Sequence, residues 1–69
     1  IRFKQEKYKE AEAEAEKAIK INADYASAYV NRGVAREMLR NQEGACSDWQ
    51  KANDLGSDLG KTYLIGNCH

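Results

Sequence analysis

The fold is decided by residues 26–59, which read ASAYVNRGVAREMLRNQEGACSDWQKANDLGSDL. From about residue 25 to 39, apolar residues recur at the three- and four-residue spacing of a helix; they are Tyr29, Val30, Gly33, Val34, Met38 and Leu39. From about residue 43 to 55, a second helical face carries Ala45, Cys46, Trp49 and Ala52. Polar residues lie between the two faces at positions 40–42. The stretch therefore predicts two helices joined by a short polar turn.

The pattern recurs along the chain at an offset of 34 residues. Residues 8–11, YKEA, align with residues 42–45, QEGA, and the same offset pairs Ala18 with Ala52, Ile21 with Leu55 and Tyr29 with Tyr63. Upstream, residues 9–21 predict a helix with a narrow contact stripe, formed by Ala11, Ala15, Ala18 and Ile19. A fixed period of this length indicates a helical repeat protein, in which each unit packs on the next.

At these residues the sequence resembles the tetratricopeptide repeat family in a bacterial-type form. The matches are Tyr29 at the first aromatic position, Gly33 at the helix-contact glycine, Ala45 and Ala52 at the alanines, and Trp49 at the later aromatic. The resemblance implies an all-α fold of antiparallel helix-turn-helix units, stacked as a short right-handed solenoid. Departures from the family pattern are Arg32 and Arg36 in place of Leu and Tyr, and the missing inter-repeat Pro after Ile21 and Leu55.

On this register residues 1–69 form a single domain. Residues 1–25 are a partial first unit, comprising the tail of one helix and a complete second helix. Residues 26–59 are a full unit, and residues 60–69 begin a third unit or form a capping helix. Asp24 is expected to cap the helix that follows it, Gly56 to end a helix in the left-handed conformation, and Ser57 or Asp58 to cap the last helix.

Composition excludes several classes of function. Eleven Lys and Arg balance eleven Asp and Glu, so no net positive charge favours nucleic acid or an anionic membrane. The apolar runs are too short to span a bilayer. The only histidine is His69, and no glycine-rich phosphate loop or metalloprotease signature occurs. We therefore expect no enzyme and no cofactor.

The resemblance implies a protein or peptide partner, bound in a concave groove lined by the first helices of successive units. The corresponding groove residues are Ser27, Val30, Asn31, Val34, Glu37 and Met38. A simpler interpretation is that Val34 and Met38 only complete the core. The alternative role for the whole chain is an end cap or self-association segment of a longer repeat protein, which would use Ile1, Phe3 and the alanine stripe.

Two more specific hypotheses concern polar residues of the helix expected at about residues 25–39. Asn31 is similar to the asparagine with which some repeat domains clamp a peptide carboxylate, and Lys61 matches a second clamp position, but Ile65 stands where an Arg is needed. Arg32, Arg36 and Arg40 share one side of the helix and could meet phosphate. Local pairing with Glu37, Glu43 or Asp48 is the better interpretation, because no second basic helix supports the row.

The two cysteines, Cys46 and Cys68, could form a disulfide. If the last two helices form an antiparallel hairpin, Cys46 lies opposite Cys68, and a disulfide would close a loop of about 23 residues that contributes roughly 3 kcal/mol. Such a bridge would place the chain in the periplasm or outside the cell; without it a cytoplasmic location fits. The alternative is a buried small residue at position 46 and an unrelated thiol in the tail. Cys46, Cys68 and His69 lack a fourth metal ligand, so we expect no metal site.

Overall fold

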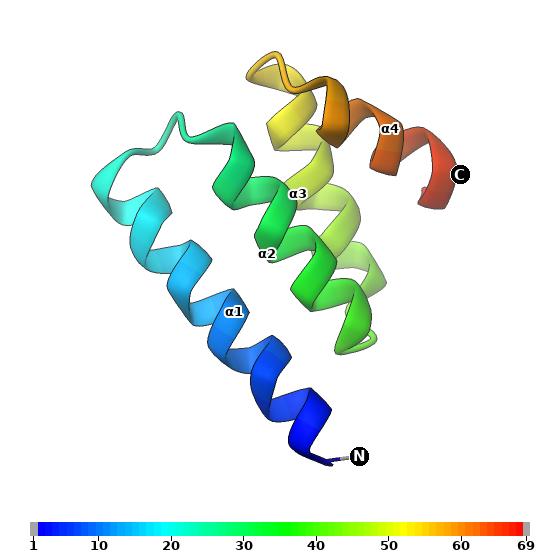
Figure 1. Ribbon diagram of the computed structural model, residues 1–69. Coiled ribbons are helices and arrows are strands. Elements are labelled where there is room, and N and C mark those ends of the chain that lie inside the picture. Colours follow the sequence, from blue (N-terminus) through cyan, green and yellow to red (C-terminus); the bar gives the residue numbers. More distant parts are fainter. Residues whose placement is uncertain (1, 69) are drawn as a thin grey trace.

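The computed structural model describes the backbone of residues 2–68 and the side chains of residues 7–68. Within this part of the chain, all regular structure is helical (Figure 1), in agreement with the all-α antiparallel fold expected from the sequence. The helices are α1 (Arg2–Ile21), α2 (Ala26–Met38), α3 (Gln42–Asp54) and α4 (Asp58–Asn67). No helix in the described range is both long and apolar enough to cross a membrane.

Helix α2 occupies the centre of the molecule. Successive helices run antiparallel, and α2 contacts α1 on one side and α3 and α4 on the other. The molecule is a thin slab with extents of 34 × 30 × 15 Å. Because the slab is about one helix pair thick, each helix keeps one face open to solvent.

Helix α1 differs from the sequence expectation at its start. We expected the tail of one helix, a turn, and a second helix from about Lys9, whereas the structure has one continuous helix from Arg2. The segment RFKQEKY contains neither Gly nor Pro to break a helix. In α3 the break is made by Asn41, whose side chain accepts a hydrogen bond from the Gly44 amide at 3.1 Å. At the repeat-equivalent position stands Lys7, which has no acceptor for this cap.

The turn between α3 and α4 is as expected from the sequence, whereas the turn between α1 and α2 differs from the expectation. Gly56 has φ 92°, as expected for a left-handed helix end, and Ser57 caps α4 by accepting a hydrogen bond from the Gly60 amide at 3.1 Å. The expected Asp24 cap is wrong, because Tyr25 occupies the cap position with no side-chain bond. The Asp24 amide instead donates to Asn22 Oδ1 at 3.1 Å, which places Asp24 within the turn.

The core is built around Trp49. Its side chain is fully buried, and its Nε1 donates to the Val30 carbonyl at 3.4 Å. Tyr63 of α4 stacks on the indole with ring centroids 5.1 Å apart. Gly33 lies against the five-membered ring of the indole, where an added Cβ would be 2.5 Å from Nε1. The close helix contact expected at Gly33 is therefore confirmed, and it is made by Trp49.

A network of ion pairs around a buried carboxylate links three helices. Asp48, 3% exposed, accepts hydrogen bonds from Arg32 at 2.7 and 3.0 Å and pairs with Arg36 at 3.3 Å. Arg36 also donates to Glu12 of α1 at 2.8 Å. The hydrogen bond to Asp48 raises the pKa of Arg32 above its ordinary value, although burial opposes this rise. The local pairing that the sequence favours for the arginine row is therefore present, and Asp48 is the carboxylate that holds both Arg32 and Arg36.

Candidate partner-binding surface

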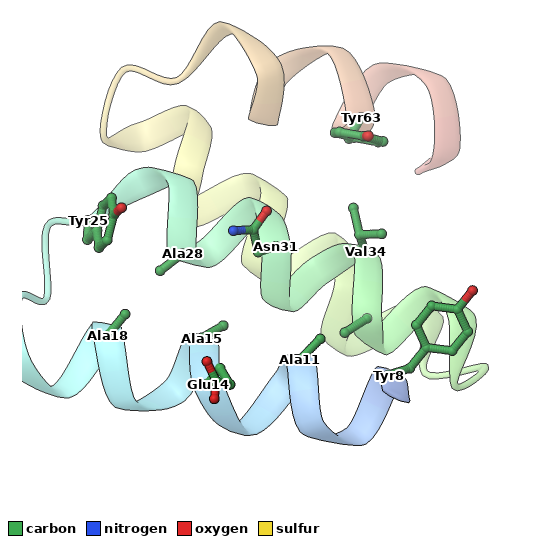
Figure 2. Close-up of a pocket in the computed structure, with 11 residues that line it drawn as sticks. Tyr8, Ala11, Glu14, Ala15, Ala18, Tyr25, Ala28, Asn31, Val34 and Tyr63 are labelled. Carbon is green, nitrogen blue, oxygen red and sulfur yellow. The ribbon is translucent and has the colours of Figure 1, made fainter. Parts of the chain in front are cut away.

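A cavity of about 640 Å³ opens between α1, α2 and α4. Figure 2 shows the alanines of α1 pointing toward α2, Ala28 of α2 pointing back at them, and Asn31 and Val34 on the side of α2 nearer Tyr63 of α4. The lining residues are Tyr8, Ala11, Glu14, Ala15, Ala18, Tyr25, Ala28, Asn31, Val34, Ala35 and Tyr63. The surface is mainly apolar, with the amide of Asn31 and the carboxylate of Glu14 among its lining groups.

Small side chains create this cavity. Ala11, Ala15 and Ala18 recur at four- and three-residue spacing and therefore lie on one face of α1. Ala28 and Ala35 of α2 meet that face and are almost fully buried. Because alanine projects only a methyl group, the two helices approach closely at their contact line and leave space above it.

Only some of the groove residues predicted from the sequence line the cavity. Asn31 and Val34 line the cavity; Asn31 is exposed, and half-buried Val34 also packs against the core. Val30 is only 3% exposed and packs in the cluster around Trp49, so its side chain is not available to a partner. Ser27, Glu37 and Met38 do not line the cavity. Met38 is 48% exposed and therefore does not complete the core.

Most of the cavity wall was not identified as binding surface from the sequence. The alanine stripe of α1 was recognised, but as a helix contact. The sequence analysis does not single out Glu14, and it names Tyr63 only as the repeat partner of Tyr29. The 34-residue repeat could have shown that these residues share a surface. It makes α1 equivalent to α3 and α2 equivalent to α4, and in the structure α2 lies between α1 and α4.

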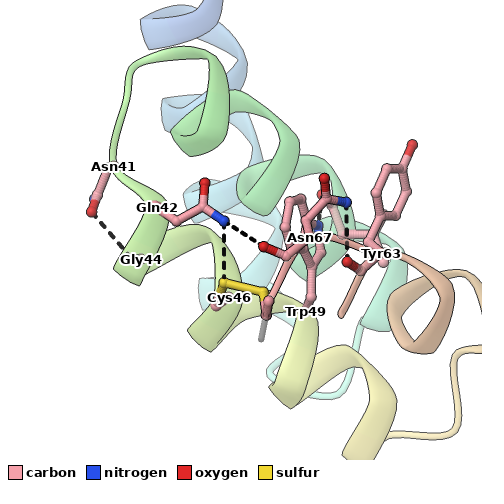
Figure 3. Close-up of a disulfide and its surroundings, with 9 residues drawn as sticks. Asn41, Gln42, Gly44, Cys46, Trp49, Tyr63 and Asn67 are labelled. Atoms are coloured by element: carbon pink, nitrogen blue, oxygen red, sulfur yellow. Dashed lines mark hydrogen bonds between the residues drawn. A yellow bond between two sulfur atoms is a disulfide. The ribbon is translucent and has the colours of Figure 1, made fainter. Parts of the chain in front are cut away.

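The cysteine pair lies away from this cavity, at the free end of α4 (Figure 3). A disulfide joins Cys46 of α3 to Cys68, with the two Cα atoms 5.9 Å apart. Beside it, Gln42 Nε2 donates to the Asn67 carbonyl at 2.7 Å. The described residues contain no group of three potential metal-binding side chains, and His69 lies outside them. The arrangement is thus a link between two helices.

Comparison with known proteins gives one family and two relatives. The sequence matches the family described as TPR repeat over residues 1–39. It is 41% identical over 56 residues to RNA polymerase II-associated protein 3 of Xenopus laevis, covering 81% of this chain and 8% of that protein. The protein of the same name from Xenopus tropicalis is 42% identical over 53 residues, covering 77% of this chain and 8% of its own. No solved structure matches.

Proposed function

This chain belongs to the tetratricopeptide (TPR) repeat family, and from that premise we propose that it is a protein–protein interaction module that binds a partner on the open face of α2. The observation that carries the proposal is the cavity beside Asn31. An exposed amide can both donate and accept hydrogen bonds, and the surrounding alanines and tyrosines offer apolar surface. Such a combination suits a protein segment with its polar backbone and apolar side chains.

The proposed set of binding residues is smaller than the set expected from the sequence. Asn31 and Val34 are the centre, and Ser27, Glu37 and Met38 form the rim on the same helix. Val30 leaves the set because it is buried. We retain 1–69 as one domain with its full unit at 26–59. The chain spans less than a tenth of the length of its curated relatives, so the proposal concerns this module alone.

The charge distribution supports a protein partner over nucleic acid. Arg32 and Arg36 are held by Asp48 and Glu12, which leaves them poorly placed to neutralise phosphates. A complete carboxylate clamp is also disfavoured, because Ile65 is 64% exposed where an Arg would be needed. We propose no catalytic role, in keeping with the scaffold function of the family.

Self-association is the second candidate. Leu59 and Ile65 of α4 are 56% and 64% exposed, and apolar side chains gathered on one helix favour contact with another protein surface. Ile1 and the side chain of Phe3, which were expected to take part, lie outside the described residues. The mass of the isolated chain by light scattering distinguishes the candidates: a monomer supports the binding module, and a concentration-dependent dimer supports self-association.

The proposed function is tested by quantitative capture of a partner on the immobilised chain. We expect Asn31→Arg to lower the amount of specific partner about tenfold, the loss typical of one central interface residue. The matched control is Ser47→Arg on the exposed face of α3, which should bind the partner as wild type does. Circular dichroism establishes that both variants are folded. Equal capture by both variants would show that the face of α2 is not the binding surface.

A further inference from the structure

The disulfide at the end of α4 is connected to the cavity through Tyr63. Cys68 directly follows α4 and is bonded to Cys46 of α3. Tyr63, in the middle of the same helix, lines the cavity. Its ring also stacks on Trp49 of α3 with the centroids 5.1 Å apart, close to the bridge (Figure 3). The position of one wall residue of the cavity therefore depends on how α4 is held against α3.

Helix α4 depends mainly on α3 for its support, since its contact with α2 is small. Tyr63 and Leu64 pack against the core from the middle of the helix. Near Cys68, the hydrogen bond from Gln42 to the Asn67 carbonyl is exposed, and water competes for such a bond. The disulfide is thus the strongest attachment of the end of α4.

We propose that thiol–disulfide exchange at Cys46 and Cys68 controls partner binding in the cavity. With the bridge intact, Tyr63 remains in the cavity wall and the chain binds its partner. With the bridge reduced, the end of α4 separates from α3 in most of the molecules, Tyr63 leaves the wall, and the affinity for the partner falls. The inference rests on the proposed function and adds the regulation of the same surface.

The bridge acts on α4 by restricting its open state. A disulfide removes conformational freedom from the chain when the linked segment opens. Reduction restores that freedom, so local opening of α4 becomes more populated. The helix has ten residues, and a free helix of that length is marginal in water. Because only the closed form presents Tyr63 to the partner, the affinity falls in proportion to the closed fraction.

The bridge is accessible to a dithiol reductant. Cys46 and Cys68 are half-buried, and a space of about 400 Å³ opens beside them between α3 and the end of α4. A thiolate of the reductant attacks one bridge sulfur to form a mixed disulfide, and the other cysteine leaves as a thiolate and takes up a proton. The second thiol of the reductant then loses its proton and attacks the mixed disulfide, which releases the first cysteine and leaves the reductant as a disulfide.

The opening of α4 is tested on the chain alone. Trp49 is the only tryptophan, so its emission reports on the contact with Tyr63. Reduction with dithiothreitol should shift the emission maximum to longer wavelength, because the indole gains contact with water. It should also weaken the nuclear Overhauser effects between the two rings. Ring contacts that are equally strong in the oxidised and reduced chain overturn the inference.

Partner affinity is then measured in both redox states. The probe is the partner that the oxidised chain retains and the Asn31→Arg variant loses, purified after elution. We expect reduction to raise its Kd about threefold to tenfold, as when the closed form falls to between about a third and a tenth of the molecules. The Cys46→Ala, Cys68→Ala double variant should bind as the reduced chain does and not respond to dithiothreitol, which separates the effect from any action on the partner.

A substitution of Tyr63 tests the route from the bridge to the cavity. Tyr63→Ala should bind the partner more weakly even with the bridge intact, and reduction should then change its Kd by less than about twofold, since the ring that the bridge positions is missing. The matched control is Leu59→Ala, which removes an exposed side chain of the same helix that does not line the cavity. It should keep the full response to reduction.

The outcomes separate this inference from the proposed function. Equal Kd values for the oxidised and reduced chain, or a full response to reduction in Tyr63→Ala, would make the inference wrong and leave the proposed function intact. If partner capture is insensitive to Asn31→Arg, the proposed function fails on its own test, and the inference that rests on it fails as well.

Discussion

Gly33 and Trp49 show how one pair of residues determines the approach of two helices. A glycine inside a helix destabilises it by roughly 1 kcal/mol relative to alanine, so its presence in α2 requires a compensating contact. Trp49 provides that contact, because its ring occupies the space in which a Cβ would lie. Gly66 in α4 has no such neighbour, with no atom within 4 Å of the position of an added Cβ. The two glycines therefore differ in function.

This difference predicts opposite effects of the same substitution. Gly33→Ala should lower the free energy of unfolding by about 1–3 kcal/mol, because the methyl group overpacks the tryptophan. Gly66→Ala should raise it by up to about 1 kcal/mol through helix propensity. Urea unfolding monitored by circular dichroism measures both. Stabilisation by Gly33→Ala would mean that the contact with Trp49 is looser than the structure has it.

Helix α4 is attached to the molecule at several points along its length. Gly60 allows the start of α4 to lie close to Ala52 of α3. Tyr63 stacks on Trp49 in the middle, and Cys68 is bonded to Cys46 at the end. Since α4 is only ten residues long, it would be marginal as an isolated helix. Its order depends on these contacts with α3.

The disulfide should account for much of this attachment. Its two cysteines are 22 residues apart in the sequence, and closing a loop of that size stabilises a protein by about 3 kcal/mol in the chain-entropy description. We expect a reductant to lower the free energy of unfolding by roughly that amount and to increase hydrogen exchange in α4 more than in α2.

The double variant Cys46→Ala with Cys68→Ala is the control for reduction. It should start with the lower stability and show no further response to reductant. If the wild-type chain is equally stable with and without reductant, and non-reducing mass analysis shows two free thiols, the cysteines do not form a bridge in solution.

At the scale of the whole molecule, stability is expected to be greatest at the centre. Helix α2 contacts every other helix in the described part of the chain, and the buried residues Val30, Ala45, Trp49 and Ala52 lie at its junction with α3. The ion pairs of Asp48 and Arg36 add a polar connection from α3 to α1. Helix α1 has only α2 as a neighbouring helix, so its far face is open.

Native-state hydrogen exchange should follow this order. Amides of Val30 and Trp49 should exchange only through global unfolding, whereas amides of α1 should exchange through local opening with a lower free energy. Exchange measured by NMR at several low urea concentrations distinguishes the two regimes. Equal protection of Ala15 and Trp49 would contradict the expected order.

The sequence by itself determined the helices apart from the start of α1, the 34-residue repeat and the close contact at Gly33, because these depend on spacing along one chain and on residue size. Only the tertiary structure decided that Val30 is buried while Asn31 is exposed, since neighbouring residues on a helix point about 100° apart and packing selects the face. It also decided that Asp48 binds Arg32 and that α1, α2 and α4 share a cavity. Contacts between distant elements depend on how helices rotate and approach one another, which local periodicity does not specify.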